Sequence, residues 1–387
     1  MKVAITDSVK YIGVDDITLD LFESQYVIPE GVSYNSYVIL DEKVAVMDTA
    51  DKRMMKEWEE NLLAELDGRS VDYLVLHHLE PDHAGSIARF LELFPEATLV
   101  GNVKTFQMLP QFFDFDIERK TLVVKEGDTL SLGEHELTFV MAPMVHWPEV
   151  MVSYDSKDKI LFSADGFGKF GALELTAGED WACEARRYYF NIVGKYGGPV
   201  QTLLKKAAAL DIQYICPLHG PVLSENLDYY IGLYDTWSSY KPENEGVLIA
   251  YASIHGNTAK VAEKLGEMLR ENGVSKVVVS DLAREDMAEV IEDAFRYDRM
   301  IIAAASYDGG VFPCMQDFLH HLQAKAYQKR KVAIVENGSW APSAGKTMRA
   351  ILDTMKDLEI VEPMVTIRST MKDSDMEKLD ELVKQMC

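Results

Sequence analysis

The sequence is poor in cysteine, and this shortage removes several classes of protein. Only four cysteines occur among 387 residues, and no two of them are closely spaced: Cys183, Cys216, Cys314 and Cys387. Four isolated cysteines without paired short spacing predict neither a disulfide framework nor a zinc or iron–sulfur knuckle. Four isolated thiols fit a reducing compartment, and we expect a cytoplasmic protein.

Basic side chains and long apolar runs are also scarce. The chain has 39 Lys and Arg against 63 Asp and Glu, a formal net charge of −24. Such a surplus of negative charge repels nucleic acid and anionic membrane surfaces, so neither is an expected partner. No run approaches the ~18 continuous apolar residues of a membrane span, and residues 1–4 do not begin a signal sequence. We expect a soluble, unprocessed chain that acts on small molecules.

The chain length and two different patterns of strands and helices predict two α/β domains. Short β-branched runs recur between residues 43 and 219 with few long helical patterns, which is typical of a sheet-rich sandwich with outer helices. After a polar break at 238–246, five strands alternate with five amphipathic helices, the pattern of a doubly wound parallel sheet. The strands expected there are 247–252, 277–280, 300–305, 331–335 and 360–367. We place the domains at 1–240 and 246–387.

The most specific motif is His78-Leu79-Glu80-Pro81-Asp82-His83, directly after the apolar run 71–76. Two imidazoles and two carboxylates within six residues are costly to bury unless a cation compensates them. Three further residues of ligand type each follow an apolar run: His146, Asp165 and His219. Loops at one edge of a sheet bring distant segments together, so we expect these side chains to converge.

Counting the ligands narrows the choice of metal. Three carboxylates and four imidazoles exceed the four positions of one tetrahedral zinc, so the sequence predicts two ions. The high oxygen content favours a harder metal such as iron over zinc.

The motif resembles His-x-His-x-Asp-His of the metallo-β-lactamase superfamily, with Glu80 in place of the second histidine. That replacement, followed by the order His, Asp, His, closely resembles the flavodiiron proteins, or A-type flavoproteins, in their minimal two-domain class. The resemblance implies an αββα domain followed by a flavodoxin-like domain. It also implies the ligands: His78, Glu80 and His146 for one iron, Asp82, His83 and His219 for the other, and Asp165 as the bridge.

Two more segments, 33–37 and 184–189, also look like segments of that family. Tyr189 is either close to the metal pocket or an ordinary core aromatic. His77 and Trp147 flank ligands. The alternatives are that they tune protons or exclude water, or that they are structural, and a structural role is expected for both.

A second constellation follows the strand expected at 247–252. Ser253-Ile254-His255-Gly256-Asn257-Thr258 offers hydroxyl and amide donors before a helix, an anion cradle that resembles the flavodoxin phosphate loop. Two more strand ends lie where flavodoxin-like domains hold the isoalloxazine ring of FMN: Ser306-Tyr307-Asp308-Gly309 and Asn337-Gly338-Ser339-Trp340. Each offers an aromatic ring for stacking.

The segment 166–171 fits the dinucleotide fingerprint Gly-x-Gly-x-x-Gly. No helix pattern continues from it, so we interpret it as a flexible loop after Asp165 rather than as a nucleotide site.

The resemblance implies an oxidoreductase in which FMN feeds a diiron centre that reduces dioxygen to water, nitric oxide to nitrous oxide, or both. It also implies a head-to-tail homodimer, or a dimer of such dimers, in which each flavin faces the partner's irons. The chain ends without a rubredoxin module, so a separate donor is expected: a rubredoxin-like protein, a reduced deazaflavin or a nicotinamide system. The alternatives are a zinc hydrolase with an appended flavodoxin and an electron-transfer module with a vestigial metal site. The sequence ranks neither the gases nor the donors.

Overall fold

The protein is described by a computed structural model covering residues 5–114 and 120–387, so the expectation about residues 1–4 lies outside the described part. The chain divides into two compact units: Met1–Tyr189 with Gly198–Asp235, and Phe190–Gly197 with Thr236–Cys387. The short segment joins the second unit because the Phe190 ring stacks on Phe295 with centroids 4.3 Å apart. Within the described ranges, no helix is both long enough and apolar enough to cross a bilayer.

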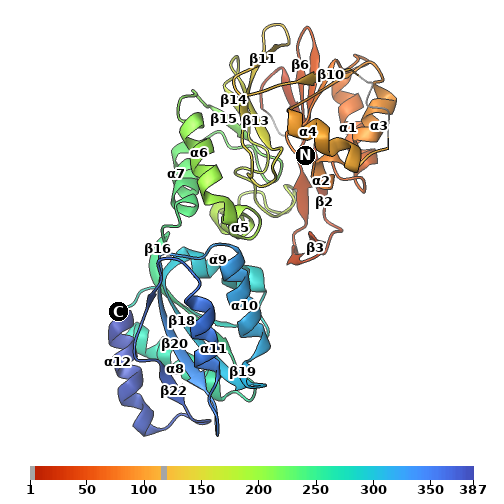
Figure 1. Ribbon diagram of the computed structural model, residues 1–387. Coiled ribbons are helices and arrows are strands. Elements are labelled where there is room, and N and C mark those ends of the chain that lie inside the picture. Colours follow the sequence, from red (N-terminus) through yellow and green to blue (C-terminus); the bar gives the residue numbers. More distant parts are fainter. Residues whose placement is uncertain (1–4, 115–119) are drawn as a thin grey trace. The chain divides into compact units, whose positions relative to one another are not determined.

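The first unit contains two facing sheets (Figure 1). One has the order β1 (Val9–Tyr11), β6 (Tyr37–Leu40), β7 (Val44–Met47), β8 (Tyr73–Val75), β9 (Thr98–Gly101) and β10 (Thr121–Val123). The other runs β11 (Thr129–Ser131), β12 (Glu136–Met141), β13 (Met151–Asp155), β14 (Ile160–Phe162) and β15 (Tyr214–Cys216). Side chains from both sheets, such as Val75 and Phe139, form one core between them.

Helices cover the outer faces of this sandwich, on one side α1 (Met55–Leu66), α3 (Ile87–Leu93) and α4 (Val103–Met108), and on the other α6 (Gly197–Ala207) and α7 (Leu227–Ser238) (Figure 1). The αββα class, with helices outside the two sheets, is therefore confirmed. The buried positions of α1 are Trp58, Leu62 and Leu66, four residues apart. These side chains form the apolar stripe of that helix.

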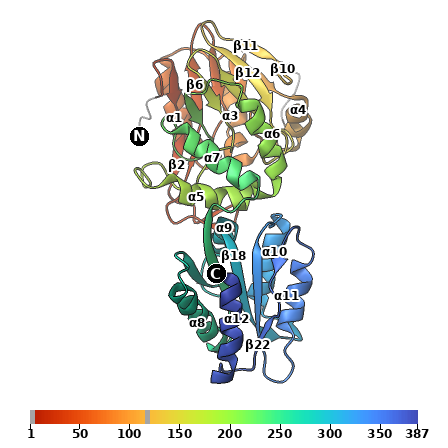
Figure 2. The ribbon, with the colours of Figure 1, turned by 90° about the vertical axis from the view of Figure 1, so that its left-hand side faces the viewer.

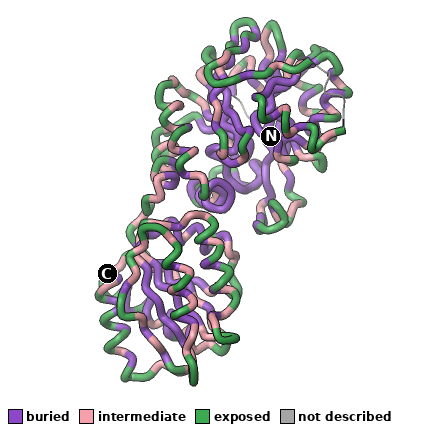
Figure 3. The backbone as a smooth tube through the Cα atoms, in the orientation of Figure 1, coloured by how far each residue is buried: buried purple, intermediate pink, exposed green. Residues whose placement is uncertain are grey.

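The second unit is a parallel sheet in the order β17 (Val277–Asp281), β16 (Asn244–Ala252), β18 (Tyr297–Tyr307) and β20 (Lys331–Asn337), followed by β21 (Glu359–Ile360) and β22 (Val365–Ile367). In Figure 2, α8 (Asn257–Glu271) and α12 (Met376–Met386) lie on one face, and α10 (Pro313–Ala324) and α11 (Ala344–Leu352) lie on the other. The strands are the buried layer, and the helices turn an exposed side outward (Figure 3). This is the doubly wound order of flavodoxins, with its switch point between β16 and β18.

One predicted strand is different in the structure. The run 360–367 is divided between β21 and β22. Pro363 lies between them and has no amide hydrogen to donate to the ladder, which accounts for the interruption.

Candidate functional site

All seven predicted metal ligands meet at one edge of the sandwich. Each comes from a loop or a short helix that follows a strand: β8 for the first four, then β12, β14 and β15. They form two groups, one of His78, Glu80, His146 and Asp165, and the other of Asp82, His83 and His219. The ends of these strands thus bring together side chains that are up to 141 positions apart in the sequence, from His78 to His219.

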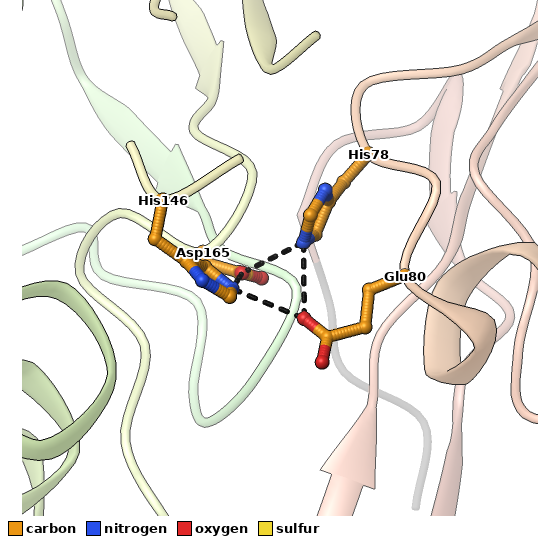
Figure 4. Close-up of side chains that lie close together, drawn as sticks. All are labelled: His78, Glu80, His146 and Asp165. Atoms are coloured by element: carbon orange, nitrogen blue, oxygen red, sulfur yellow. Dashed lines mark hydrogen bonds and ion pairs between the residues drawn. The ribbon is translucent and has the colours of Figure 1, made fainter. Parts of the chain in front are cut away.

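The first group points inward around one centre (Figure 4). The Oε2 atom of Glu80 lies 3.1 Å from His78 Nε2 and 3.0 Å from His146 Nε2. Asp165 Oδ2 lies 3.0 Å from His146 Nε2 and 3.3 Å from His78 Nε2. Ligands held about 2.1 Å from a single ion are about 3.0–3.4 Å from one another, so these separations are those of a coordination shell.

The second group has the same spacing. His83 Nε2 and His219 Nε2 face each other at 3.0 Å, and Asp82 Oδ2 lies 3.4 Å and 3.3 Å from them. The other oxygen of Asp165, Oδ1, is 3.7 Å from His83 Nε2 and 4.0 Å from His219 Nε2. Asp165 therefore turns one oxygen toward each group, as a bridging carboxylate does.

Unsatisfied atoms test whether metal ions fit this site. Both carboxylate oxygens of Asp82 and Oδ1 of Asp165 are buried without a hydrogen-bond partner in the part of the chain that the structure describes. Buried carboxylates without partners are strongly unfavourable, and cations between the groups would satisfy all three oxygens. The residues fit two ions.

The pKa values describe the same site without metal. Burial disfavours the charged form of His146, but hydrogen bonds to Asp165 and Glu80 outweigh it and raise its pKa to about 9. Burial would raise the pKa of Asp165, yet the facing histidines hold it well below its usual range. In the metal-free protein, protons on imidazoles thus take the place of cations, and metal binding must displace them.

The segment 33–37 holds the loop that carries His219. His219 Nδ1 donates to the Ser33 carbonyl at 2.8 Å, which leaves Nε2 for a metal. The side-chain amide of Asn35 donates to the Pro217 carbonyl at 2.8 Å, and the Tyr37 hydroxyl donates to the same oxygen at 2.7 Å.

Several residues around the ligands escaped sequence reasoning. Glu149 lies 2.9 Å from His78 Nδ1, and a lone acid in a loop gave no signal beyond its position after His146. Tyr188, rather than Tyr189, packs on His219, with ring centroids 5.4 Å apart. The Tyr189 ring packs against Tyr234.

The two flanking aromatic residues have structural contacts, as expected. His77 Nδ1 pairs with Asp48 at 2.5 Å and its Nε2 meets Ser153 Oγ at 2.8 Å. The edge of Trp147 meets the His78 ring, with centroids 5.2 Å apart.

A small opening leads to the ligands. A cavity of about 260 Å³ is lined by Glu80 and Asp82 together with Phe22, Glu23 and Tyr34. Burial and the neighbouring Glu80 raise the pKa of Glu23 to about 7 in the metal-free protein. A small molecule can therefore enter from this side and meet both ligand groups.

The segment 166–171 forms turns and irregular backbone rather than a helix, as predicted, and its residues are buried.

Another group of ligand-type side chains, His135, Asp155 and Asp158, lies elsewhere in the unit. The ammonium of Lys157 is 3.3 Å from His135 Nε2, so a cation already faces that group.

The predicted flavin loops line one cavity of about 530 Å³ in the second unit. It is formed by residues of all three segments: Ser253, Ile254, His255, Asn257, Thr258, Ser306, Tyr307, Asp308, Gly309, Asn337, Gly338, Ser339 and Trp340. Gly256 lies within the first segment and has a φ of +85°, a conformation that favours glycine. The three segments follow β16, β18 and β20, around the switch point of the sheet.

The cavity offers a phosphate site at one end and aromatic rings at the other. No side chain within the described ranges caps the N-terminus of α8, so its first amides are available to an anion. Ser253 Oγ accepts a hydrogen bond from the Gly256 amide at 3.1 Å, which shapes the loop. Tyr307 and Trp340 are 44% and 92% exposed, so both rings can cover a bound flavin.

Comparisons with known proteins match both units. The family described as ODP family beta lactamase matches residues 32–220, and the flavodoxin domain family matches residues 248–374. The nitric oxide reductase of Moorella thermoacetica is 28% identical over 99% of this chain and 98% of its own length. The putative diflavin flavoprotein A 2 of Synechocystis is 32% identical over 70% of this chain, which spans 47% of that longer protein.

Among solved structures, the rubredoxin oxygen:oxidoreductase from Desulfovibrio gigas superposes with a TM-score of 0.91 at 25% identity, covering 100% of this chain and 98% of that one. The flavodiiron protein from Giardia intestinalis has the same fold, with a TM-score of 0.91 at 24% identity, covering 100% of this chain and 97% of that one. Both domain families, the two-unit fold and the relatives agree, and the chain belongs to the flavodiiron protein family.

Proposed function

We propose that this protein is an oxidoreductase that reduces dioxygen to water, nitric oxide to nitrous oxide, or both, at a diiron centre fed by FMN. The observation that carries the proposal is the combination, in one chain, of a seven-residue shell for two ions and a flavodoxin-type cavity. The relatives support the reaction class, since they include nitric oxide reductases and a rubredoxin oxygen:oxidoreductase.

We assign His78, Glu80 and His146 to one iron, Asp82, His83 and His219 to the other, and Asp165 to the bridge. The segments 253–258, 306–309 and 337–340 bind FMN. When bound, the irons supply the open positions and the electrons for reducing a diatomic gas, and FMN supplies further electrons.

The chain's own residues do the rest. The hydrogen bond from His219 Nδ1 to the Ser33 carbonyl orients the His219 ring toward the site. Glu23 lies at the opening beside Glu80 and Asp82, where its carboxyl can exchange protons with a molecule that enters there. Trp147 and Phe112 stack with centroids 6.2 Å apart beside the first ligand group and shield it from water.

The two cofactors belong to different domains, which we place at 1–240 and 246–387. We propose a head-to-tail homodimer, alone or paired into a dimer of dimers, in which each flavin serves the partner's irons. The electron donor is a separate rubredoxin-like protein or a reduced deazaflavin. Four isolated cysteines suit a cytoplasmic location.

Metal analysis and anaerobic turnover test the proposal. We expect two irons and one FMN per chain, and consumption of one or both gases without release of hydrogen peroxide when a reduced rubredoxin is supplied. Inactivity of the fully loaded protein toward both gases would overturn it. A zinc-loaded protein that hydrolyses esters or thioesters would support the hydrolase alternative, which the relatives do not favour.

A further inference from the structure

Glu149 is a fully buried carboxylate whose contacts are directed at a single ligand. Its Oε1 atom accepts a hydrogen bond from the Leu79 amide at 2.9 Å and lies 2.9 Å from His78 Nδ1. Its other oxygen, Oε2, is buried without a hydrogen-bond partner in the described part of the chain. Because an ionised carboxylate only accepts hydrogen bonds, this contact places the proton of His78 on Nδ1 and leaves Nε2 free for a metal.

Among the described residues, no carboxylate accepts a hydrogen bond from the Nδ1 atoms of the two histidines in the second metal group. His219 Nδ1 donates to the neutral carbonyl of Ser33, and His83 Nδ1 is buried without a hydrogen-bond partner among the described residues. Of these three imidazoles, only His78 has a carboxylate behind it. A carboxylate behind a metal-bound imidazole increases electron donation from the ring to the metal. The ion of the first group therefore receives more electron density from this outer contact than the ion of the second.

We propose that Glu149 is a positioning residue that fixes His78 for metal binding and makes the two irons unequal. The iron held by His78, Glu80 and His146 then has the lower reduction potential, and the iron held by Asp82, His83 and His219 is reduced first. The inference rests on the proposed diiron function, and it concerns the order in which the two ions accept electrons rather than the reaction itself.

The same unit contains a matched control. Asp155 is also fully buried, and its Oδ2 atom lies 3.0 Å from His135 Nδ1 and accepts the Asp158 amide at 3.0 Å. Its Oδ1 atom, like Oε2 of Glu149, has no hydrogen-bond partner in the described ranges. On the other side of the imidazole, His135 Nε2 meets Ser8 Oγ at 2.8 Å rather than any of the seven predicted iron ligands. Asp155→Asn thus repeats the loss of a buried carboxylate behind an imidazole without touching the proposed irons.

The experiment compares Glu149→Gln, Asp155→Asn and the unaltered full-length protein, each loaded with iron without air. A redox titration followed by electron paramagnetic resonance measures the two reduction steps of the diiron centre, and competition with a chelator measures iron affinity. In Glu149→Gln we expect the lower step to move upward, the gap between the steps to narrow, and iron affinity to fall about 10- to 100-fold. Asp155→Asn is expected to keep both steps and the iron affinity.

An unchanged gap in Glu149→Gln, or an equal change in both variants, would overturn the proposal and reduce Glu149 to a structural residue. If Glu149→Gln does not fold, Glu149→Asp provides the same test, because its shorter side chain withdraws the carboxylate from Nδ1. A narrowed gap supports the proposal, and an unchanged gap overturns it. Failure of the proposed function is separate, because it would appear in the unaltered protein as an absence of iron or of gas reduction.

Discussion

The metal centre and the flavin pocket are built from opposite kinds of groups. The centre is made of buried, charged side chains, three of whose carboxylate oxygens have no hydrogen-bond partner among the described residues. The flavin pocket is made of turns, hydroxyls and exposed rings, such as the nearly fully exposed Trp340. Water can hydrate most polar groups of the flavin pocket when it is empty, whereas three buried carboxylate oxygens of the metal centre have no hydrogen-bond partner among the described residues.

This difference predicts how each region depends on its cofactor. Protons on the imidazoles replace the cations only in part, because three buried carboxylate oxygens have no hydrogen-bond partner among the described residues, so the first unit should be more stable with its ions than without them. The amides at the start of α8 are solvated in the absence of a phosphate, so the second unit should fold well without FMN. The cofactors then contribute stability to one region and mainly function to the other.

The largest effect is expected from Asp165→Ala. Asp165 turns one oxygen toward each ligand group, so its removal should release both ions. We expect iron to fall from two per chain to nearly none and gas reduction to fall by more than about a hundredfold, with FMN unchanged. Metal analysis and flavin absorbance measure both cofactors in the same sample.

Two further variants complete this comparison. Glu80→Ala should also lose iron and keep FMN, because Glu80 contacts both imidazoles of the first group. Thr258→Ala, in the loop before α8, should lose FMN and keep iron. Loss of both cofactors in any one of these variants would contradict two independent sites.

Removal of metal by a chelator should destabilise the first unit alone. A ligand present at about a thousand times its dissociation constant stabilises a fold by about 4 kcal/mol, which for a unit of this size is about 10 °C in melting temperature. Calorimetry should show one transition moving down by that amount while the flavin-containing transition stays in place. Equal shifts of both transitions would mean that the two units unfold as one.

Most of the site could be predicted from the sequence because each ligand follows an apolar run and strand ends converge. The residues that surround the ligands could not be predicted from the sequence. Glu149 is a single acid in a loop, and only the fold shows that it reaches back to His78. Which tyrosine of the segment 184–189 faces the ligands depends on the rotation of a helix, which the sequence does not define to one residue. Pro363, by contrast, was a visible reason to divide the strand expected at 360–367.

The pH dependence of stability should reverse when the metal is removed. Folding raises the pKa of His146 from about 6.5 to about 9, because hydrogen bonds to Asp165 and Glu80 outweigh its burial. The stability that this contributes is complete below pH 6.5 and is lost as the pH rises through about 9. The metal-free unit should therefore melt about 5 °C lower at pH 9 than at pH 6.5. With iron bound, deprotonation strengthens the metal bonds, so the melting temperature should not fall over this range.

The smallest effect is expected from Trp340→Ala in the flavin pocket. The ring is 92% exposed and lines the cavity, so its removal leaves no hole in the core and should not change the melting temperature of the flavin-free protein. Stacking of an aromatic ring contributes about 1 kcal/mol, so FMN affinity should fall about fivefold to tenfold. Trp340→Phe keeps a ring and should recover most of that affinity, which flavin fluorescence can measure. A loss of stability in the flavin-free variant would show that this pocket, like the metal centre, is part of what holds its unit together.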